Sequence, residues 1–450
     1  MTPPRPRATI VRPFEVTHGG VLLLAVPMML AYLSTPLVGL VDTAVVGQLG
    51  SAALIGGIAV AALIFDVVFA AFNFLRSATT GLTAQALGAG DAAEEQSVLF
   101  RALLIAIAAG AAILLLQQPI GTIGLAALGV RGDVAAAAAT YFFVRVWSAP
   151  LALVNYAVLG WVLGRAEAGA GLALQTLLNG VNIVLSVIFV LVWDWGVAGA
   201  AWGTVIAEMV TAAAGLALAG WKLRDALRPG WIAILDVARL RRMMSVNSDI
   251  MIRSLALLFA FAFFMRQGAA FGDVVLAANA ILMHFFLVGG YFLDGFATAA
   301  EQLAGRAVGA RYRPAFERTV RLTTIWGLAT ALLLSAFFAA IGPSLIDLIT
   351  TAPEVRDVAR LYLPWAVLTP VIATIAFQMD GIFIGATWSR DMRNMMLVSV
   401  FVYVAAWAVV TPIFGNHGLW GALLIFLGAR SITFHWRMRH LLPRTFPAVP

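Results

Sequence analysis

Eleven ionisable side chains lie within or at the edges of long apolar stretches of this 450-residue chain. In the centre of a membrane helix a charge costs about 2.5–3.5 kcal/mol on insertion scales, so such residues are expected to be paired, to face a cavity or to be functional. They are Asp42, Asp66, Arg76, Arg145, Glu208, Asp249, Arg253, Asp294, Glu301, Asp380 and Arg430.

Asp42 is the strongest candidate for proton coupling because no basic residue lies within one helical turn of it. Desolvation in a partly dry cavity disfavours a carboxylate, so Asp42 could take up a proton on one side of a membrane and release it on the other. Pro27 and Pro36 remove backbone hydrogen bonds from the same stretch and permit kinks, which predicts hinges there. In the alternative interpretation, Asp42 only accepts a hydrogen bond from a neighbouring Asn, Thr or Tyr.

Three acids of the second half form another candidate site for a proton or a cation. Asp294 and Glu301 are seven residues apart and therefore share one helix face. Asp380 follows Pro364 and Pro370, and none of the three acids has an obvious basic partner in the sequence. The alternative for Asp380 is a role at the helix end with Gly381 and Gly385.

The other charges have simpler structural interpretations. Asp249 and Arg253 have the i,i+4 spacing of an ion pair on one helix. Arg430 lies near a helix end, where its long side chain could reach the interface. Asp66, Arg145 and Glu208 all fall near the midplane of the first half, which predicts a charge network that holds this half together.

The composition requires a membrane. Apolar residues make up 62% of the chain and charged residues only 11%, whereas soluble domains carry about 25% charged residues. A soluble enzyme, a disordered chain and a coiled coil are therefore excluded. The absence of Cys excludes disulfides and thiolate metal sites.

Twelve stretches are long and apolar enough to span a bilayer, so the sequence predicts an all-α polytopic membrane protein. The stretches cover residues 20–46, 53–80, 98–117, 135–162, 170–193, 197–220, 246–267, 275–303, 318–341, 358–386, 394–413 and 418–436.

The halves of the chain resemble each other at an offset near 220 residues, which predicts two pseudo-symmetric six-helix bundles. "GWVLG" at 160–164 parallels "GIFIG" at 381–385. The predicted parts are a cytoplasmic tail (1–19), an N-lobe with spans 1–6 (20–220), a basic cytoplasmic linker (221–245), a C-lobe with spans 7–12 (246–436) and a second cytoplasmic tail (437–450). Most Lys and Arg residues fall in the tails and even-numbered loops, which predicts that both termini are cytoplasmic.

Several motifs resemble the multidrug and toxic compound extrusion (MATE) transporters, specifically the DinF-like branch. They are "LVDTAVVGQLG" in span 1, "FLRSATTGLTAQALGAGD" in span 2, "YFLDGFATAAEQLAGRAVGA" in span 8 and "QMDGIFIGATWSRDMRNMM" in spans 10–11. The resemblance covers nearly the whole chain. It implies export of amphipathic, often cationic compounds, driven by inward H⁺ or Na⁺.

The resemblance also implies roles for individual residues. Pro27 matches the kink proline of the first helix, and Asp42 matches the acid there. Asn155, Asn182 and Thr204 match polar residues of the N-lobe cavity. Ser186 is a departure, because the family archetypes have Asp at this position, one turn after Asn182. One carboxylate with neutral oxygens is a poorer site for a hard cation, so we expect H⁺ rather than Na⁺ to be the coupling ion.

Asn182 and Ser186 lie four residues apart on one helix face, where they could bind substrate or only bridge helices. No HExxH, GxSxG or Walker A pattern occurs, so neither enzyme activity nor ATP binding is expected. No cofactor or metal is expected, and the dispersed basic residues do not indicate nucleic acid. We expect a monomer in the bilayer of a bacterial inner membrane. The alternative function is a flippase for lipids or lipid-linked precursors.

Overall fold

The computed structural model describes residues 11–224, 230 and 234–447, and in these residues every regular element is a helix. Within the described residues, eleven helical segments are long and apolar enough to cross a membrane. The last of them, Ser389–Thr445, has 57 residues and is kinked at Gly415, whose φ of 57° and ψ of −133° are not helical. It therefore supplies two spans, and the predicted all-α fold with twelve transmembrane helices is confirmed.

The predicted N-lobe begins with one continuous helix and contains two spans that are interrupted. Its helices are α1 (His18–Gly47), α2 (Ala52–Phe72), α3 (Phe74–Ala89), α4 (Ala92–Leu115), α5 (Gln117–Ala127), α6 (Gly132–Arg145), η1 (Val146–Ser148), α7 (Ala149–Gly164), α8 (Ala168–Val187), η2 (Ile188–Val192) and α9 (Gly196–Lys222).

The predicted C-lobe consists of longer helices, of which only the last, Ser389–Thr445, is kinked among the described residues. They are α11 (Val237–Ala269), α12 (Asp273–Gly309), α13 (Arg313–Ile349), α14 (Pro353–Gly385) and α15 (Ser389–Thr445).

Two local features differ from the hydropathy pattern. The short helix α5 is an additional element, because its 11 residues are too few to span a bilayer. Span 2 is divided at Asn73 into α2 and α3. Hydropathy averages over such breaks, so the sequence analysis could not separate these pieces.

The domain boundaries remain predictions, and helices extend into both of the segments expected to connect or follow the lobes. Helix α11 begins at Val237, inside the predicted linker 221–245, and α15 continues to Thr445, inside the predicted tail 437–450. Residues 1–10, 225–229, 231–233 and 448–450 of the predicted tails and linker lie outside the described residues.

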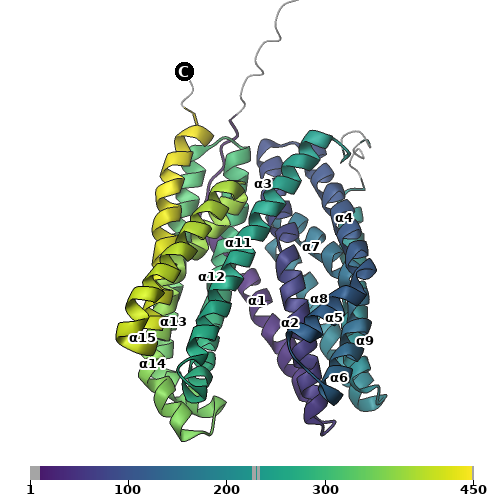
Figure 1. The fold of residues 1–450 in the computed structure, drawn as a ribbon. Coiled ribbons are helices and arrows are strands. Elements are labelled where there is room, and N and C mark those ends of the chain that lie inside the picture. Colours follow the sequence, from purple (N-terminus) through teal and green to yellow (C-terminus); the bar gives the residue numbers. More distant parts are fainter. Residues whose placement is uncertain (1–10, 225–229, 231–233, 448–450) are drawn as a thin grey trace, which may run out of the picture.

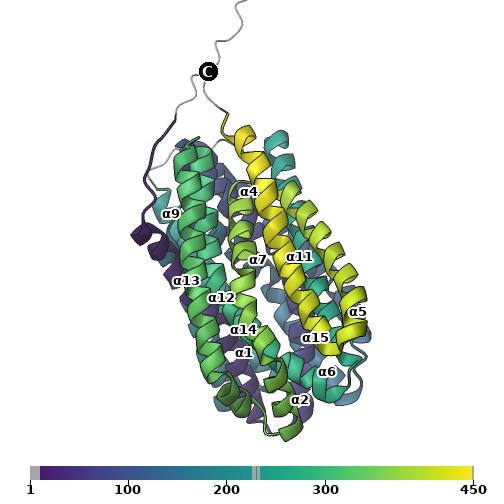
Figure 2. The ribbon, with the colours of Figure 1, turned by 90° about the vertical axis from the view of Figure 1, so that its left-hand side faces the viewer.

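The two lobes lie close together at the end of the molecule that carries both termini and separate toward the opposite end (Figure 1). In the C-lobe, α14 lies between α13 and α15 (Figure 2). One hydrophobic cluster joins the N-lobe core to C-lobe residues such as Phe296, Phe316 and Phe383. A second cluster, which includes Phe264, Phe338 and Trp420, belongs to the C-lobe alone.

Glycines bring the helices of the two lobes into contact at the end that carries the termini. A Cβ added at Gly88 of α3 would lie 2.9 Å from the backbone N of Ala310, just beyond α12. A Cβ at Gly305 of α12 would lie 2.7 Å from the Cβ of Ala84. The side chain of Gln85 also crosses between the lobes, because its Nε2 donates to the carbonyl of Gly385 at 2.9 Å. The two lobes therefore meet here almost backbone to backbone.

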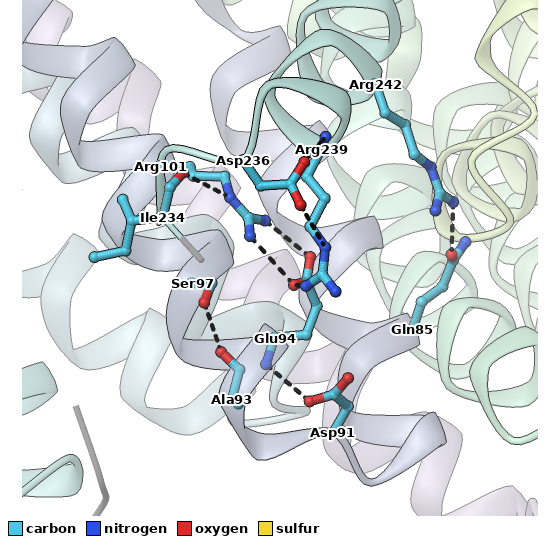
Figure 3. Close-up of polar contacts among 10 residues, drawn as sticks. All are labelled: Gln85, Asp91, Ala93, Glu94, Ser97, Arg101, Ile234, Asp236, Arg239 and Arg242. Carbon is cyan, nitrogen blue, oxygen red and sulfur yellow. Dashed lines mark hydrogen bonds and ion pairs between the residues drawn. The ribbon is translucent and has the colours of Figure 1, made fainter. Parts of the chain in front are cut away.

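A cluster of charged residues fixes the start of α11 to the N-lobe (Figure 3). Arg101 of α4 is buried and donates from Nη1 to Glu94 Oε1 at 2.8 Å and from Nε to the carbonyl of Ile234 at 3.1 Å. Arg239 of α11 forms a second ion pair with Glu94. Beside this cluster, Arg242 of α11 donates to Gln85 at 3.4 Å.

Arg101→Met is expected to lower the free energy of unfolding by about 1–3 kcal/mol, because it removes a buried donor from both Glu94 and the carbonyl of Ile234. Thermal unfolding of the purified protein should show a lower midpoint than the wild type. Arg321→Met removes an exposed arginine of α13 and is the matched control. Equal midpoints for the two variants would contradict the stabilising role of Arg101.

Candidate functional site

A cavity of about 660 Å³ lies within the N-lobe and is lined by α1, α2, α6, α7, α8 and α9. Its ionisable lining residues include three acids and one arginine, namely Asp42, Asp66, Glu208 and Arg145. With the acids ionised, this wall has an excess of negative charge, which favours a cationic ligand.

Asp42 lines this cavity, and its carboxylate accepts a hydrogen bond from the hydroxyl of Ser186 at 2.7 Å. Ser186 is fully buried. The alternative interpretation named Asn, Thr or Tyr as the donor to Asp42, whereas the donor is the hydroxyl of Ser186. The residue that departs from the family pattern is therefore in direct contact with the candidate coupling acid.

The other predicted polar residues of the cavity form two further contacts. Asn182 Nδ2 donates to Thr204 Oγ1 at 2.9 Å, which links α8 to α9. Asn155 Nδ2 donates to Glu208 Oε2 at 2.6 Å and also to the Glu208 carbonyl at 3.0 Å. Asn155, Asn182 and Thr204 line the cavity together with Asp42, whereas Ser186 lies behind Asp42.

The predicted network of Asp66, Arg145 and Glu208 is not an ion-paired one. All three residues line the N-lobe cavity, but Arg145 donates to the Tyr141 hydroxyl at 3.3 Å and stacks 4.6 Å from the centre of the Phe65 ring. Among the described residues, Arg145 forms no ion pair with either acid. Asp66 and Glu208, which the sequence pattern assigned to a structural network, are therefore acids of the cavity wall.

Helix α1 contacts both lobes on its way to Asp42. Tyr32 hydrogen-bonds through its hydroxyl to Thr298 of α12 at 2.9 Å, and Ser34 accepts a hydrogen bond from Asn179 of α8 at 2.6 Å. The helix runs from His18 to Gly47 without a break, although Pro27 and Pro36 lie inside it. Both prolines lack a backbone N–H, so α1 has two weakened positions between its start and Asp42.

A second cavity of about 350 Å³ lies mainly within the C-lobe and contains all three acids predicted there, Asp294, Glu301 and Asp380. The expectation that these acids lack basic partners is wrong for Asp380 and Glu301, whereas Asp294 forms no ion pair among the described residues. Arg430 of α15 donates to Asp380 Oδ2 at 2.6 Å, and Arg253 of α11 forms an ion pair with the same oxygen. Arg76 of α3 lies 3.9 Å from Glu301.

Two other predictions about charged residues are also wrong, because the packing of the helices brings partners from elsewhere in the chain. Asp249 does not pair with Arg253 on its own helix but with Arg393 of α15 at 2.6 Å. Arg430 does not reach the membrane interface, since it is buried and points to Asp380. In both cases a neighbouring helix places an opposite charge closer than the sequence spacing does.

No group of three His, Cys, Asp or Glu side chains in the described parts of the chain could hold a metal ion. The two cavities present carboxylates, guanidinium groups, hydroxyls and amides.

The MatE family model matches the chain twice, over residues 27–188 and 250–410. The chain belongs to the MatE family. One match begins in each half of the chain, in agreement with the predicted internal repeat. The match to MatE also confirms the resemblance that the motifs of spans 1, 2, 8 and 10 indicate.

Individual relatives of this MatE protein cover almost its full length. DNA damage-inducible protein F of Escherichia coli K12 is 38% identical over 92% of this chain and 92% of its own length. A probable multidrug resistance protein NorM of Agrobacterium fabrum is 26% identical over 94% of each chain. A solved outward-facing multidrug resistance MATE transporter of the MOP superfamily has a TM-score of 0.86 at 21% identity, covering 95% of this chain and 97% of its own. The last likeness shows a shared fold.

Proposed function

We propose that this protein is a secondary multidrug exporter that exchanges small amphipathic, often cationic compounds for inward-moving H⁺. The observation that carries the proposal is the N-lobe cavity, in which three acids face one arginine and Asp42 is held by a single serine hydroxyl. The names of the Agrobacterium relative, a probable multidrug resistance protein, and of the solved multidrug resistance transporter support export as the activity.

The exchange follows from competition for the negative charge of the cavity. When Asp42 is ionised, its charge attracts a cationic group into the cavity. When Asp42 takes up a proton, this charge disappears and the cation is released. The proton that binds to Asp42 therefore replaces the positive charge that leaves with the substrate. Polar contacts for the ligand are supplied by the amides of Asn155 and Asn182 and by the hydroxyl of Thr204.

The proposed coupling ion is H⁺ rather than Na⁺, because the side chain that contacts Asp42 is the hydroxyl of Ser186 and not a second carboxylate. Hard cations are held best by several carboxylate and carbonyl oxygens. In the C-lobe, the guanidinium groups of Arg253 and Arg430 occupy the neighbourhood of Asp380. This pairing makes Asp380 less suited to release and rebind a proton, so we assign the main coupling role to Asp42 and an auxiliary one to Asp294 and Glu301.

The proposed conformational change is a rocking of the two lobes with bending of α1 at Pro27 and Pro36. Helix α1 supports this role because it carries Asp42 and contacts both α8 and α12. We further propose that the protein acts as a monomer in a bacterial inner membrane, with both termini in the cytoplasm. The lobes would then be closed on the cytoplasmic side and separated on the outer side in the conformation described above.

Ser186→Asp tests the assignment of the coupling ion. It is expected to make export respond to an imposed Na⁺ gradient, because a second carboxylate beside Asp42 supplies the oxygens that a hard cation requires. Transport of a cationic dye in proteoliposomes, with a Na⁺ gradient and no pH gradient, is the measurement. Ser186→Ala is the matched control and should remain unresponsive to Na⁺. A wild-type protein that already responds to Na⁺ would contradict the assignment.

A further inference from the structure

The C-lobe cavity differs from the N-lobe cavity in its charged groups. The N-lobe cavity contains three acids and Arg145, whereas the C-lobe cavity contains three acids and three arginines. The arginines Arg76, Arg253 and Arg430 come from α3, α11 and α15, which lie far apart in the sequence. This cavity therefore contains as many guanidinium groups as carboxylates, whereas the N-lobe cavity contains more carboxylates.

The arginines are not fully satisfied by the acid between them. Arg253 and Arg430 both contact the same oxygen of Asp380, Oδ2, with Arg430 at 2.6 Å. Asp380 Oδ1 and the Nε atoms of Arg253 and Arg430 are buried without a hydrogen-bond partner among the described residues. Asp294 also interacts electrostatically with both arginines, so the charges on this side of the cavity are balanced, but the two Nε donors are left without an acceptor. A buried donor without a partner is stabilised by an additional acceptor, such as an oxygen of a bound carboxylate.

The other two acids of the cavity differ in their partners. Glu301 is opposed by Arg76 at 3.9 Å. Asp294 of α12 lines the cavity but has no hydrogen-bond or ion-pair partner for its side chain in the described residues. Apolar walls are provided by Phe261, Phe286 and Phe377. The cavity thus combines an aromatic wall, two arginines with unpaired Nε donors, and an acid without an ion pair, Asp294.

We propose that the C-lobe cavity binds the carboxylate of an aromatic or aliphatic acid, with Arg253 as the accessible guanidinium and Arg430 as its buried support. Arginine presents a planar fork of donors that matches a carboxylate, and such charge-assisted hydrogen bonds are stronger than neutral ones. At about 350 Å³ the cavity has the size of a small ligand pocket. This site goes beyond the proposed export of cations, which depends on the N-lobe cavity and Asp42.

The test is binding of 2-naphthoate to the full-length protein in lipid nanodiscs at neutral pH, measured by calorimetry, with protonated 2-naphthylmethylamine as the probe of opposite charge. Arg253→Gln is expected to weaken naphthoate binding at least tenfold and to leave binding of the amine unchanged or stronger. Asp294→Asn is expected to strengthen naphthoate binding, because it removes a like charge from the cavity. Arg266→Gln, an exposed arginine of the same helix α11, is the matched control and should bind as the wild type does.

The opposite signs expected for Arg253→Gln and Asp294→Asn separate a ligand site from a structural ion-pair network, since loss of packing would weaken binding in both variants. Arg253→Lys retains the charge without the fork and should bind naphthoate with intermediate affinity, which keeps the test valid if Arg253→Gln fails to fold. The proposal would be overturned if the wild type does not bind naphthoate. It would also be overturned if Arg253→Lys binds naphthoate as tightly as the wild type while Asp294→Asn binds it more weakly. If the wild-type protein binds naphthoate but does not export a cationic dye, only the proposed function is refuted.

Discussion

Asp42→Asn is expected to abolish proton-coupled export while the protein remains folded. Asparagine has nearly the same shape as aspartate and can still accept the hydrogen bond from Ser186, which Asp42 accepts at 2.7 Å. It cannot take up or release a proton, and it cannot supply the negative charge that attracts a cation into the cavity. The expected loss of pH-driven dye transport is therefore at least tenfold, with little change in the thermal unfolding midpoint.

Asp194→Asn is the matched control for Asp42→Asn, because Asp194 is exposed in the turn before α9. The control should transport as the wild type does. Normal pH-driven transport by Asp42→Asn would contradict the coupling role of the N-lobe cavity and would direct attention to the C-lobe acids Asp294 and Glu301.

Gly88→Ala is expected to impair transport through the contact between the lobes. The added Cβ would lie 2.8 Å from the carbonyl carbon of Arg306 and 2.9 Å from the backbone N of Ala310, so α3 and α12 would have to move apart. Overpacking of this kind costs about 1–3 kcal/mol. The cost applies only to the arrangement in which α3 touches α12, so it should shift the equilibrium between conformations by about 5- to 150-fold.

The shift can be measured by the distance between two spin labels on the side of the membrane opposite the termini. The chain contains no Cys, so Asp194→Cys and Thr351→Cys would place a label on each lobe without background. Gly88→Ala should reduce the population with the long separation. Gly180→Ala in α8, where an added Cβ meets nothing within 4 Å, is the matched control. The same distance distribution in both variants would show that the glycine contact does not hold the lobes together.

The sequence was sufficient to predict the spans, since each depends on local hydrophobicity alone. The breaks at Asn73 and Val146–Ser148 were not predictable, because they do not change the average hydropathy of spans 2 and 4. The kink at Gly415 was not predictable either. Hydropathy locates the two spans on either side of it but does not show that they form one kinked helix.

The candidate site was predictable where the family resemblance named its residues and unpredictable where partners come from distant helices. Asp42, Asn155, Asn182 and Thr204 do line one cavity. In contrast, spacing along one helix suggested that Arg253 pairs with Asp249, whereas α14 and α15 place other partners closer to both residues. Pairs between α11 and α14 depend on how the helices pack, and a single sequence contains no direct signal for that packing.

The most direct test of the account is uptake of a cationic dye by proteoliposomes with an imposed pH gradient and no Na⁺. We predict accumulation that collapses when a protonophore is added and that is absent in Asp42→Asn. No accumulation in the pH gradient, together with accumulation when a Na⁺ gradient is imposed instead, would contradict proton coupling at Asp42.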